Sequence, residues 1–398
     1  MTEQNVQTHW RFWPVLCLVF IFAFSSPIVM LAAPIYYIQQ HVEIIFVSLL
    51  STALTITYSI SPIILNKISD RLGRRKSVII ALIGATGAQL VFFISLHPIV
   101  FLIERLFEGF ILGFFFPNLQ ASISDNAEID HQKYLARFNL SWGIAGVFGL
   151  LFGAVFLTFI DDLRFLFYIN PIFLALNVVI AILFFQEPIH DEEDNQQIEI
   201  EVIRPEDHQK LLNSSNFYIP VILPLLFILG LSFASGNGTL LYPIKSEVLG
   251  FQPSSTFLVV VFATITQSLA MYLSNLVALK KLKLLTSLTL LIYALMFIFF
   301  IINEFYFIFI VLFMLSGFFY GILYGTASRL FLSLNIIKDT SIYSSISESS
   351  IGLFFFISQI ILGIIAGINV NFAYISLSII LVLIFIINLI FQKNFKEV

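Results

Sequence analysis

Along the chain, long apolar segments alternate with short polar connections. The apolar segments cover roughly residues 12–38, 42–66, 76–96, 98–124, 137–160, 164–186, 216–244, 252–279, 284–302, 305–334, 344–368 and 370–391. A hydrocarbon core of about 30 Å is crossed by about 20 residues of helix, and each segment approaches or exceeds that length. The pattern therefore predicts twelve membrane-spanning helices.

The longest polar connection lies in the middle of the chain. Residues 187–215 are acidic and poor in aromatic side chains, with a run of four acids at 191–194. A segment of this kind buries too little apolar surface to fold alone, which predicts a solvated linker. A regulatory or metal-binding role for its acids is the alternative. The expected domains are a six-helix bundle at 1–186, the linker at 187–215 and a second six-helix bundle at 216–398.

Composition supports an all-α membrane protein. Of the 398 residues, 59% are apolar and 11% are charged, whereas soluble domains carry about 25% charged residues. This excludes an ordinary soluble globular protein. The single cysteine, Cys17, lies in the first apolar segment and has no partner for a disulfide or a thiolate metal site.

The basic residues indicate how the helices are oriented. Of the 20 lysines and arginines, only Arg164 and Lys245 fall on the side of the membrane opposite the N-terminus, and Arg105 lies within a helix. The others lie in the terminal segments and the even-numbered loops. Because cytoplasmic loops of membrane proteins are enriched in basic residues, we expect both termini in the cytoplasm and a multi-pass protein of the plasma membrane.

Glycine spacing suggests that the two bundles are copies of each other. The fourth segment contains Gly109 and Gly113, and the tenth contains Gly317 and Gly321 in the same place. Glycines four residues apart share one helix face and let a neighbouring backbone approach closely. Their recurrence predicts two pseudo-symmetric halves of the kind that move around a site near the membrane midplane.

The loop between the second and third segments, residues 66–76, is the most specific part of the sequence. It reads Asn-Lys-Ile-Ser-Asp-Arg-Leu-Gly-Arg-Arg-Lys. This resembles the signature loop of the major facilitator superfamily, although Asn66 replaces the usual first glycine. A generic basic loop would explain the arginines and lysines, but not Asp70 and Gly73 at these spacings.

Two further segments resemble motifs of the same family. Arg105 with Gly109 and Gly113 is similar to the motif whose membrane-embedded arginine is associated with proton coupling. On the fifth segment, Gly146 and two later glycines, Gly149 and Gly153, resemble the antiporter motif. Leu150 and Ala154 stand at that motif's proline and last glycine. The resemblance points to the drug:proton antiporter or sugar-efflux branch.

The resemblance implies a conformational latch on the cytoplasmic side. Its expected residues are Asp70, Arg71, Gly73, Arg74, Arg75 and Asp125. Asp125 lies at the inner end of the fourth segment, where Arg74 is expected to reach it. Asp70 is expected to meet the positive end of the eleventh segment, near residues 344–347.

Arg105 and Glu108 are the candidates for proton coupling. Ionisable groups are unfavourable in a bilayer, and those that remain there are functional candidates. The two residues are three positions apart and can pair on one helix face, with Glu108 close to the midplane. Two interpretations remain open: a titratable acid in the transport path, or an ion pair that neutralises two charges. Glu104 is expected nearer the interface and solvated, and Glu348 is the next coupling candidate.

The family resemblance places helices 1, 4, 7 and 10 around a substrate cavity. The seventh and tenth segments supply the cavity candidates Asn237, Tyr242, Tyr320 and Tyr324. Each tyrosine offers an aromatic face and a hydroxyl group to a ligand. Packing or interfacial anchoring is the alternative role for each of them.

The predicted function is secondary active transport of a small molecule by alternating access, in the form of proton-coupled efflux. No phosphate loop and no histidine pair spaced for metal is present, so we expect no enzyme, cofactor or metal. The alternatives are an uptake transporter, and a substrate sensor or scaffold with the same fold. The expected partners are the small-molecule substrate, the proton and the lipid bilayer, with no nucleic acid, and the protein is expected to be a monomer.

Overall fold

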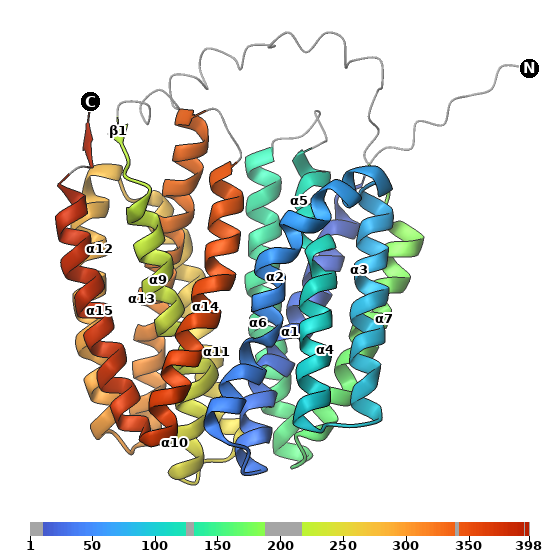
Figure 1. The fold of residues 1–398 in the computed structure, drawn as a ribbon, viewed down its shortest axis with the longest axis horizontal. Coiled ribbons are helices and arrows are strands. Elements are labelled where there is room, and N and C mark those ends of the chain that lie inside the picture. Colours follow the sequence, from blue (N-terminus) through green and yellow to red (C-terminus); the bar gives the residue numbers. More distant parts are fainter. Residues whose placement is uncertain (1–10, 125–130, 188–216, 339–341, 394, 398) are drawn as a thin grey trace, which may run out of the picture.

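The computed structural model describes residues 11–124, 131–187, 217–338, 342–393 and 395–397. Its helices stand side by side in two groups, with the connecting loops at the two ends of the molecule (Figure 1). One group is built from the first half of the chain and the other from the second half. The acidic linker from residue 188 onward lies outside the described residues.

The first half is helical with short breaks. Its elements are α1 (Trp13–Gln39), α2 (Ile44–Leu72), α3 (Arg74–Gln89), the 3₁₀ turn η1 (Leu90–Phe93), α4 (Pro98–Ile111), the 3₁₀ turn η2 (Leu112–Phe114), α5 (Phe116–Ser124), α6 (His131–Phe159) and α7 (Arg164–Phe184).

The second half repeats this arrangement. Its elements are β1 (Phe217–Tyr218), α9 (Ile222–Gly236), η4 (Asn237–Leu241), α10 (Tyr242–Val248), α11 (Pro253–Leu276), α12 (Leu279–Ile302), α13 (Tyr306–Lys338), α14 (Ile342–Ile368), α15 (Val370–Gln392) and β2 (Lys396–Glu397). The two short strands pair in antiparallel orientation, with Phe217 opposite Glu397.

The fourth expected span, 98–124, is not a single helix. Helix α4 ends at Ile111, one 3₁₀ turn follows, and α5 begins at Phe116. Pro117 lacks the N–H group that would continue the α-helical ladder, which accounts for the break. Among the described residues, 11 helices are long and apolar enough to cross a membrane. The shorter pieces α4, η2 and α5 together make the remaining crossing.

Another break interrupts the seventh crossing. Between α9 and α10 lies the π-helical turn Asn237–Leu241, which contains Gly238 and Thr239. A π-helical turn widens the helix locally and redirects its side chains. The turn lies at the boundary between the two halves, where α1, α2 and α14 contact it.

Gly109 and Gly113 bring α4 into close contact with α2. A methyl group on Gly109 would overlap the carbonyl oxygen of Leu54, and one on Gly113 would overlap the Ser61 side chain. The Ser61 hydroxyl donates a hydrogen bond of 3.3 Å to the Gly109 carbonyl, which ties the two helices together.

Gly317 and Gly321 bring α13 into close contact with α11 in the same way. A methyl group on Gly317 would overlap the Ala263 carbonyl oxygen, and one on Gly321 would overlap that of Gln267. Helix pairs also repeat, because α3 packs on α7 as α12 packs on α15. The pseudo-symmetry expected from the glycine spacing is therefore present in the fold.

The glycines of α6 differ in what they contact. A methyl group on Gly149 would overlap the Phe24 carbonyl oxygen of α1, and Gly153 lies against the Phe257 ring of α11. Gly146 has more room, since an added methyl group would lie 3.9 Å from the nearest carbonyl oxygen. Helix α6 thus joins the first half to α11 of the second half through Gly153.

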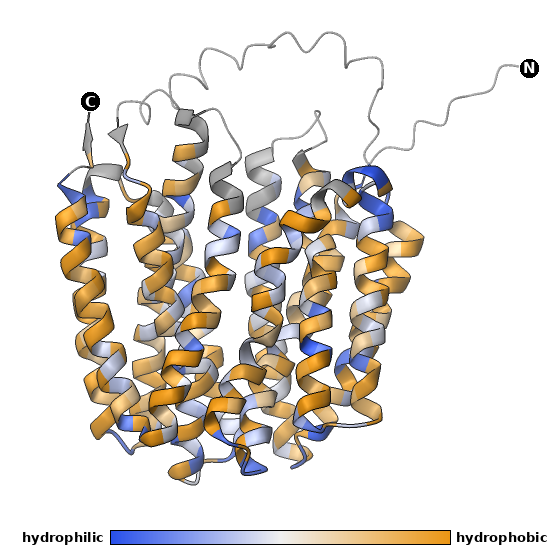
Figure 2. Ribbon diagram, in the orientation of Figure 1, coloured by the Kyte–Doolittle hydropathy of each residue, from blue (hydrophilic) through white to orange (hydrophobic). Residues whose placement is uncertain are grey.

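Hydrophobic residues predominate along the helices, and hydrophilic residues gather towards the helix ends and the loops (Figure 2). Large apolar residues such as Ile94, Phe159 and Phe307 are exposed. Exposed apolar surface on this scale is typical of a protein whose solvent is the lipid bilayer.

Candidate functional site

A cavity of about 230 Å³ lies where the two halves meet. The first half contributes Pro27, Met30 and Leu31 from α1 and Leu150 from α6. The second half contributes the other lining residues: Ala234, Ser235, Gly238, Thr239, Val260, Ala263, Thr264, Gln267, Tyr293, Phe313, Ser316, Gly317, Tyr320 and Phe355. Every one of these residues is uncharged.

Several polar groups in the cavity wall already have partners. The Thr239 hydroxyl donates to the Ser235 carbonyl at 3.1 Å and accepts from Gln359 Nε2 at 2.9 Å. The hydroxyls of Tyr293 and Ser316 share a hydrogen bond of 2.9 Å. By contrast, the side chains of Gln267 and Tyr320 make no hydrogen bond to any described residue, so both are available to a ligand.

The tyrosines expected at the cavity occupy different places. Tyr320 lines the cavity, and Tyr324 stacks on it with ring centroids 6.5 Å apart and planes 9° apart. Tyr242 does not line it. Its ring is fully buried against Phe309 and Phe313, at centroid distances of 5.1 Å and 4.7 Å.

Asn237 also lies behind the cavity wall. Its Oδ1 accepts a hydrogen bond of 3.1 Å from the hydroxyl of Tyr374 on α15, and the residue is 1% exposed. The π-helical turn explains the difference from the sequence expectation, since it presents Gly238 and Thr239 to the cavity in place of Asn237.

Arg105 and Glu108 form a buried ion pair. Arg105 Nη1 lies 2.5 Å from Glu108 Oε2, and their side chains are 5% and 3% exposed. Gln89 Nε2 of α3 donates to Glu108 Oε1 at 2.9 Å, and Asn170 Nδ2 of α7 donates to Gln89 Oε1 at 2.6 Å. The guanidinium also lies over the Phe101 ring.

This cluster faces the interior of the first bundle, contrary to the expectation that Glu108 lies in the transport path. No residue of α3, α4 or α7 is among those that line the cavity. Helix α4 presents Glu108 to Gln89 of α3, while α2 packs against its glycines. Any effect of these charges on the cavity must therefore pass through neighbouring helices.

Glu104 is buried, which corrects the expectation of a solvated side chain near the interface. It is 4% exposed, and its neighbour of like charge is Glu108. Tyr37 of α1 interacts electrostatically with it, while the Tyr37 hydroxyl donates to the Leu96 carbonyl at 3.0 Å. Glu104 belongs to the buried stripe of α4, whose other members are Phe101, Arg105, Glu108 and Gly109, and this face of the helix packs inside the bundle.

The loop between α2 and α3 is held by several bonds. Arg74 Nη1 lies 3.0 Å from Asp70 Oδ1 and 3.4 Å from Asn118 Oδ1 of α5. The Ser69 hydroxyl donates to the same Asn118 oxygen at 2.5 Å. Gly73, at φ +83°, adopts a backbone conformation that side-chain-bearing residues rarely adopt, and it starts the turn into α3.

Two further bonds attach this loop to the end of the first bundle. The Arg74 N–H donates to Glu187 Oε1 at 2.6 Å, and Arg75 Nη2 donates to the Ile182 carbonyl at 2.7 Å. Arg71 is exposed. Asp125 lies outside the described residues, and no bond joins Asp70 to the described part of α14.

Glu348 of α14 lies near tyrosines of both halves. Its carboxylate interacts electrostatically with the hydroxyls of Tyr58 on α2 and Tyr324 on α13. The residue is exposed, unlike Glu104 and Glu108. It remains the second coupling candidate.

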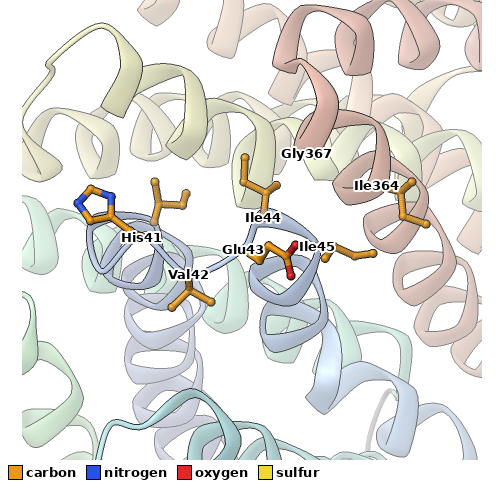
Figure 3. Close-up of a pocket in the computed structure, with 8 residues that line it drawn as sticks. His41, Val42, Glu43, Ile44, Ile45, Ile364 and Gly367 are labelled. Atoms are coloured by element: carbon orange, nitrogen blue, oxygen red, sulfur yellow. The ribbon is translucent and has the colours of Figure 1, made fainter.

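A larger hollow of about 560 Å³ opens at the end of the molecule that carries the α1–α2 turn (Figure 3). It is lined by Ile38, His41, Val42, Glu43, Ile44, Ile45, Ile364 and Gly367. Apart from His41 and Glu43 these side chains are apolar. The hollow marks the seam between the α1–α2 turn and the end of α14, and its few polar groups do not converge on one point.

Sequence reasoning missed Gln89 and Asn170 as site residues. Each is an amide within an apolar segment, which is the signal that could have marked it. Gln89 and Asn170 are 81 positions apart in the sequence, and only the packing of α3 on α7 brings them together.

The model of the Major Facilitator Superfamily matches residues 15–336 of the chain. A crystal structure of the nucleoside transporter NupG has a TM-score of 0.73 and 13% identity, covering 96% of this chain and 99% of that one. A crystal structure of a D-xylose-proton symporter has a TM-score of 0.69 and 14% identity, covering 97% of this chain and 98% of that one.

A POT family transporter in complex with 5-aminolevulinic acid has a TM-score of 0.71 and 14% identity, covering 96% of each chain. No curated protein sequence matches this chain closely enough to be called a relative. The family match extends over most of the chain and agrees with the two six-helix halves. The chain therefore belongs to the Major Facilitator Superfamily and is a multi-pass membrane transporter, not an enzyme.

Proposed function

We propose that this transporter carries an uncharged small molecule that has both an apolar face and hydrogen-bonding groups. The observation that supports this most directly is the cavity wall, which contains no charged side chain. A charged ligand would lose its hydration there without an ionic partner, which is strongly unfavourable. Met30, Phe313 and Phe355 suit an apolar face, and Gln267 and Tyr320 supply hydrogen bonds.

Alternating access supplies the transport step in this proposal. The bundles at 1–186 and 216–398 rock about the cavity, and the linker at 187–215 lets them move. One chain supplies every lining residue of the cavity, so a monomer suffices. The basic α2–α3 loop and both termini face the cytoplasm by the positive-inside rule, with the plasma membrane as the location.

The latch acts on the cytoplasmic side. Asp70 and Arg74 hold each other at 3.0 Å, and Asn118 and Glu187 bind the same arginine. We extend the latch to these two residues beside Arg71, Gly73, Arg75 and Asp125. Breaking and remaking such charge-assisted bonds changes the relative stability of the two transport conformations.

A proton gradient drives the transport, and the Arg105–Glu108 cluster binds the proton. The support is the burial of these charges in a part of the bundle that lies apart from the substrate cavity. The D-xylose-proton symporter among the similar structures is also named for proton coupling. A site of this kind couples through helix movement and does not contact the substrate.

Efflux is the proposed direction, supported by the α6 glycines Gly149 and Gly153, which bring α6 against α1 and α11. Uptake is the second candidate, and its support is the likeness to a sugar symporter. Inside-out and right-side-out vesicles carrying opposite pH gradients distinguish the two. Efflux predicts accumulation in inside-out vesicles that are acidified internally.

A ligand panel with matched charges tests the substrate class. The probes are uridine against uridine monophosphate, D-xylose against D-xylonate, and benzyl glucoside against benzyl glucuronide. Because a bound ligand stabilises the folded state, the melting temperature of the purified protein reports binding. The proposal predicts that an uncharged member raises the melting temperature more than its charged counterpart. Stabilisation by the charged members alone, or by no member of the panel, would contradict it.

A further inference from the structure

One corner of the first bundle contains more negative than positive charge. Glu104, Arg105 and Glu108 of α4 are 4%, 4% and 2% exposed. Arg105 pairs with Glu108 at 2.5 Å, which leaves Glu104 as an additional acid. With both carboxyls ionised, the group would carry a net negative charge inside the membrane-spanning region, which is strongly unfavourable.

Glu104 lacks a hydrogen-bond donor. Both of its carboxyl oxygens are shielded from solvent and accept no hydrogen bond from the described residues. The group within hydrogen-bond reach is the carboxyl of Glu108. Two ionised carboxylates have only acceptor atoms, so they can bond to each other only when they share a proton.

The other polar groups around the pair do not supply a second positive charge. Tyr37 of α1 is neutral, and its hydroxyl donates to the Leu96 carbonyl. Gln89 of α3 donates to Glu108, and Asn170 of α7 donates to Gln89. Helix α2 presents the hydroxyls of Thr57 and Ser61 to the glycine face of α4. Among these described neighbours, Arg105 alone is positively charged.

The second half forms the same helix junction without charges. Gly317 of α13 is the counterpart of Gly109, which makes Ser316 the counterpart of Glu108. Ser316 bonds at 2.9 Å to Tyr293 of α12, just as Glu108 bonds to Gln89 of α3. A neutral hydroxyl pair is therefore sufficient to hold this junction together. Packing alone therefore does not explain why the first half has charged residues at this junction.

We propose that Glu104 and Glu108 share one proton, which Glu104 carries while Glu108 stays ionised beside Arg105, and that this is the binding site of the coupling proton. The assignment of coupling rests on the proposed function. Loading the site forms one O–H bond on Glu104 and takes one proton from the water on that side. Release breaks the same bond and returns the proton to water on the other side.

Helix α1 connects this site to the cavity. Met30 and Leu31 line the cavity, and Tyr37, about 9 Å further along the helix, interacts with Glu104. Loss of the proton from Glu104 leaves two adjacent negative charges, which repel each other and disturb the contacts of Tyr37. Movement of α1 then changes the cavity wall.

Infrared spectroscopy of the protein in nanodiscs tests the proton site without any substrate. A protonated carboxyl group gives a C=O stretching band that an ionised one lacks. We expect this band at neutral pH in the wild type, and we expect Glu104→Gln to remove it. Glu43→Gln, an exposed acid in the α1–α2 turn, is the matched control and should keep the band. An unchanged band in Glu104→Gln would overturn the assignment.

A second variant keeps the test decisive if Glu104→Gln does not fold. In Glu108→Gln, Arg105 has only Glu104 left as an ionic partner, so Glu104 should give up its proton and the band should again disappear. A band that persists in Glu108→Gln overturns the shared proton.

Transport assays then examine coupling separately. Wild-type proteoliposomes should accumulate a probe from the neutral panel under a pH gradient, whereas Glu104→Gln should only exchange it across the membrane. Accumulation by Glu104→Gln with wild-type pH dependence would overturn the coupling role. If the wild type accumulates no probe but the infrared band is assigned to Glu104, the shared proton stands and the proposed function fails.

Discussion

Gly109 on α4 and Gly317 on α13 occupy equivalent positions in the two halves, and each lies against a backbone carbonyl of the neighbouring helix. The carbonyls belong to Leu54 of α2 and Ala263 of α11. Close backbone approach of this kind requires small residues, because a methyl group would overlap the opposing oxygen. The relationship links the repeat seen in the sequence to a physical contact in the fold.

Replacing either glycine by alanine should destabilise the protein by about 1–3 kcal/mol, since overpacking forces the helices apart. The matched control is Gly87→Ala in α3, where no atom lies within 4 Å of the added methyl group. Thermal unfolding in detergent measures both effects. Equal melting temperatures for Gly109→Ala and Gly87→Ala would show that the close contact does not matter for stability.

How much the sequence could predict depended on whether the signal was local. Gly109 and Gly113 have an obvious spacing, so a short-range pattern identified them. The loop motif also marked Asp70 and Arg74, but their bond to each other was not predicted, because Arg74 was expected to reach Asp125 and Asp70 the eleventh segment. The break at Pro117 was also signalled locally, but the surrounding apolar run obscured it. Helix ends were less accurate: the second helix was expected to end near residue 66, but α2 continues to Leu72 and ends at Gly73.

The site was harder to predict because its members meet only through tertiary packing. Nothing local indicates that Asn170 bonds to Gln89, or that Glu108 lies outside the cavity wall. A π-helical turn then shifts Asn237 behind the cavity wall, which a regular helical projection cannot anticipate. Near such a turn, the face on which a residue lies can be assigned only from the structure.

Glu108→Gln should abolish accumulation driven by a pH gradient but permit exchange of substrate between compartments of equal pH. The reason is that Arg105 would then hold Glu104 permanently ionised, so the site could no longer load and release a proton. Counterflow and gradient-driven uptake in the same proteoliposomes measure the two activities. Glu43→Gln is the control. Wild-type accumulation with wild-type pH dependence would leave Glu108 with a purely structural role.

Asp70→Asn should leave folding intact and impair transport. The Asp70–Arg74 bond is partly exposed, so it contributes only about 0.2–1 kcal/mol to stability, but its loss shifts the balance between transport conformations. Asp161→Asn, an exposed acid in the loop before α7, is the matched control. Transport rates normalised to folded protein provide the measurement. An undiminished rate in Asp70→Asn would remove the latch from the mechanism.

Tyr320→Phe should weaken substrate binding, while Tyr242→Phe should not. The Tyr320 hydroxyl lies in the cavity wall and one ligand hydrogen bond is worth about 0.5–1.5 kcal/mol, or about tenfold or less in affinity. The Tyr242 hydroxyl is buried and unpartnered, so its removal is neutral or slightly stabilising. Ligand-induced shifts in melting temperature compare the two variants. A larger loss in Tyr242→Phe would mean that the cavity is not the binding site.

In the proposed mechanism, a proton gradient drives an uncharged molecule through this protein. The most direct measurement is accumulation of the neutral probe that stabilises the purified protein, in proteoliposomes with an imposed pH gradient of either direction. Wild-type protein should concentrate the probe against its own gradient in one pH orientation, and a proton ionophore should collapse that gradient. Glu104→Gln should accumulate no probe. Equilibration of the probe without accumulation in either orientation, by folded wild-type protein, would contradict this mechanism.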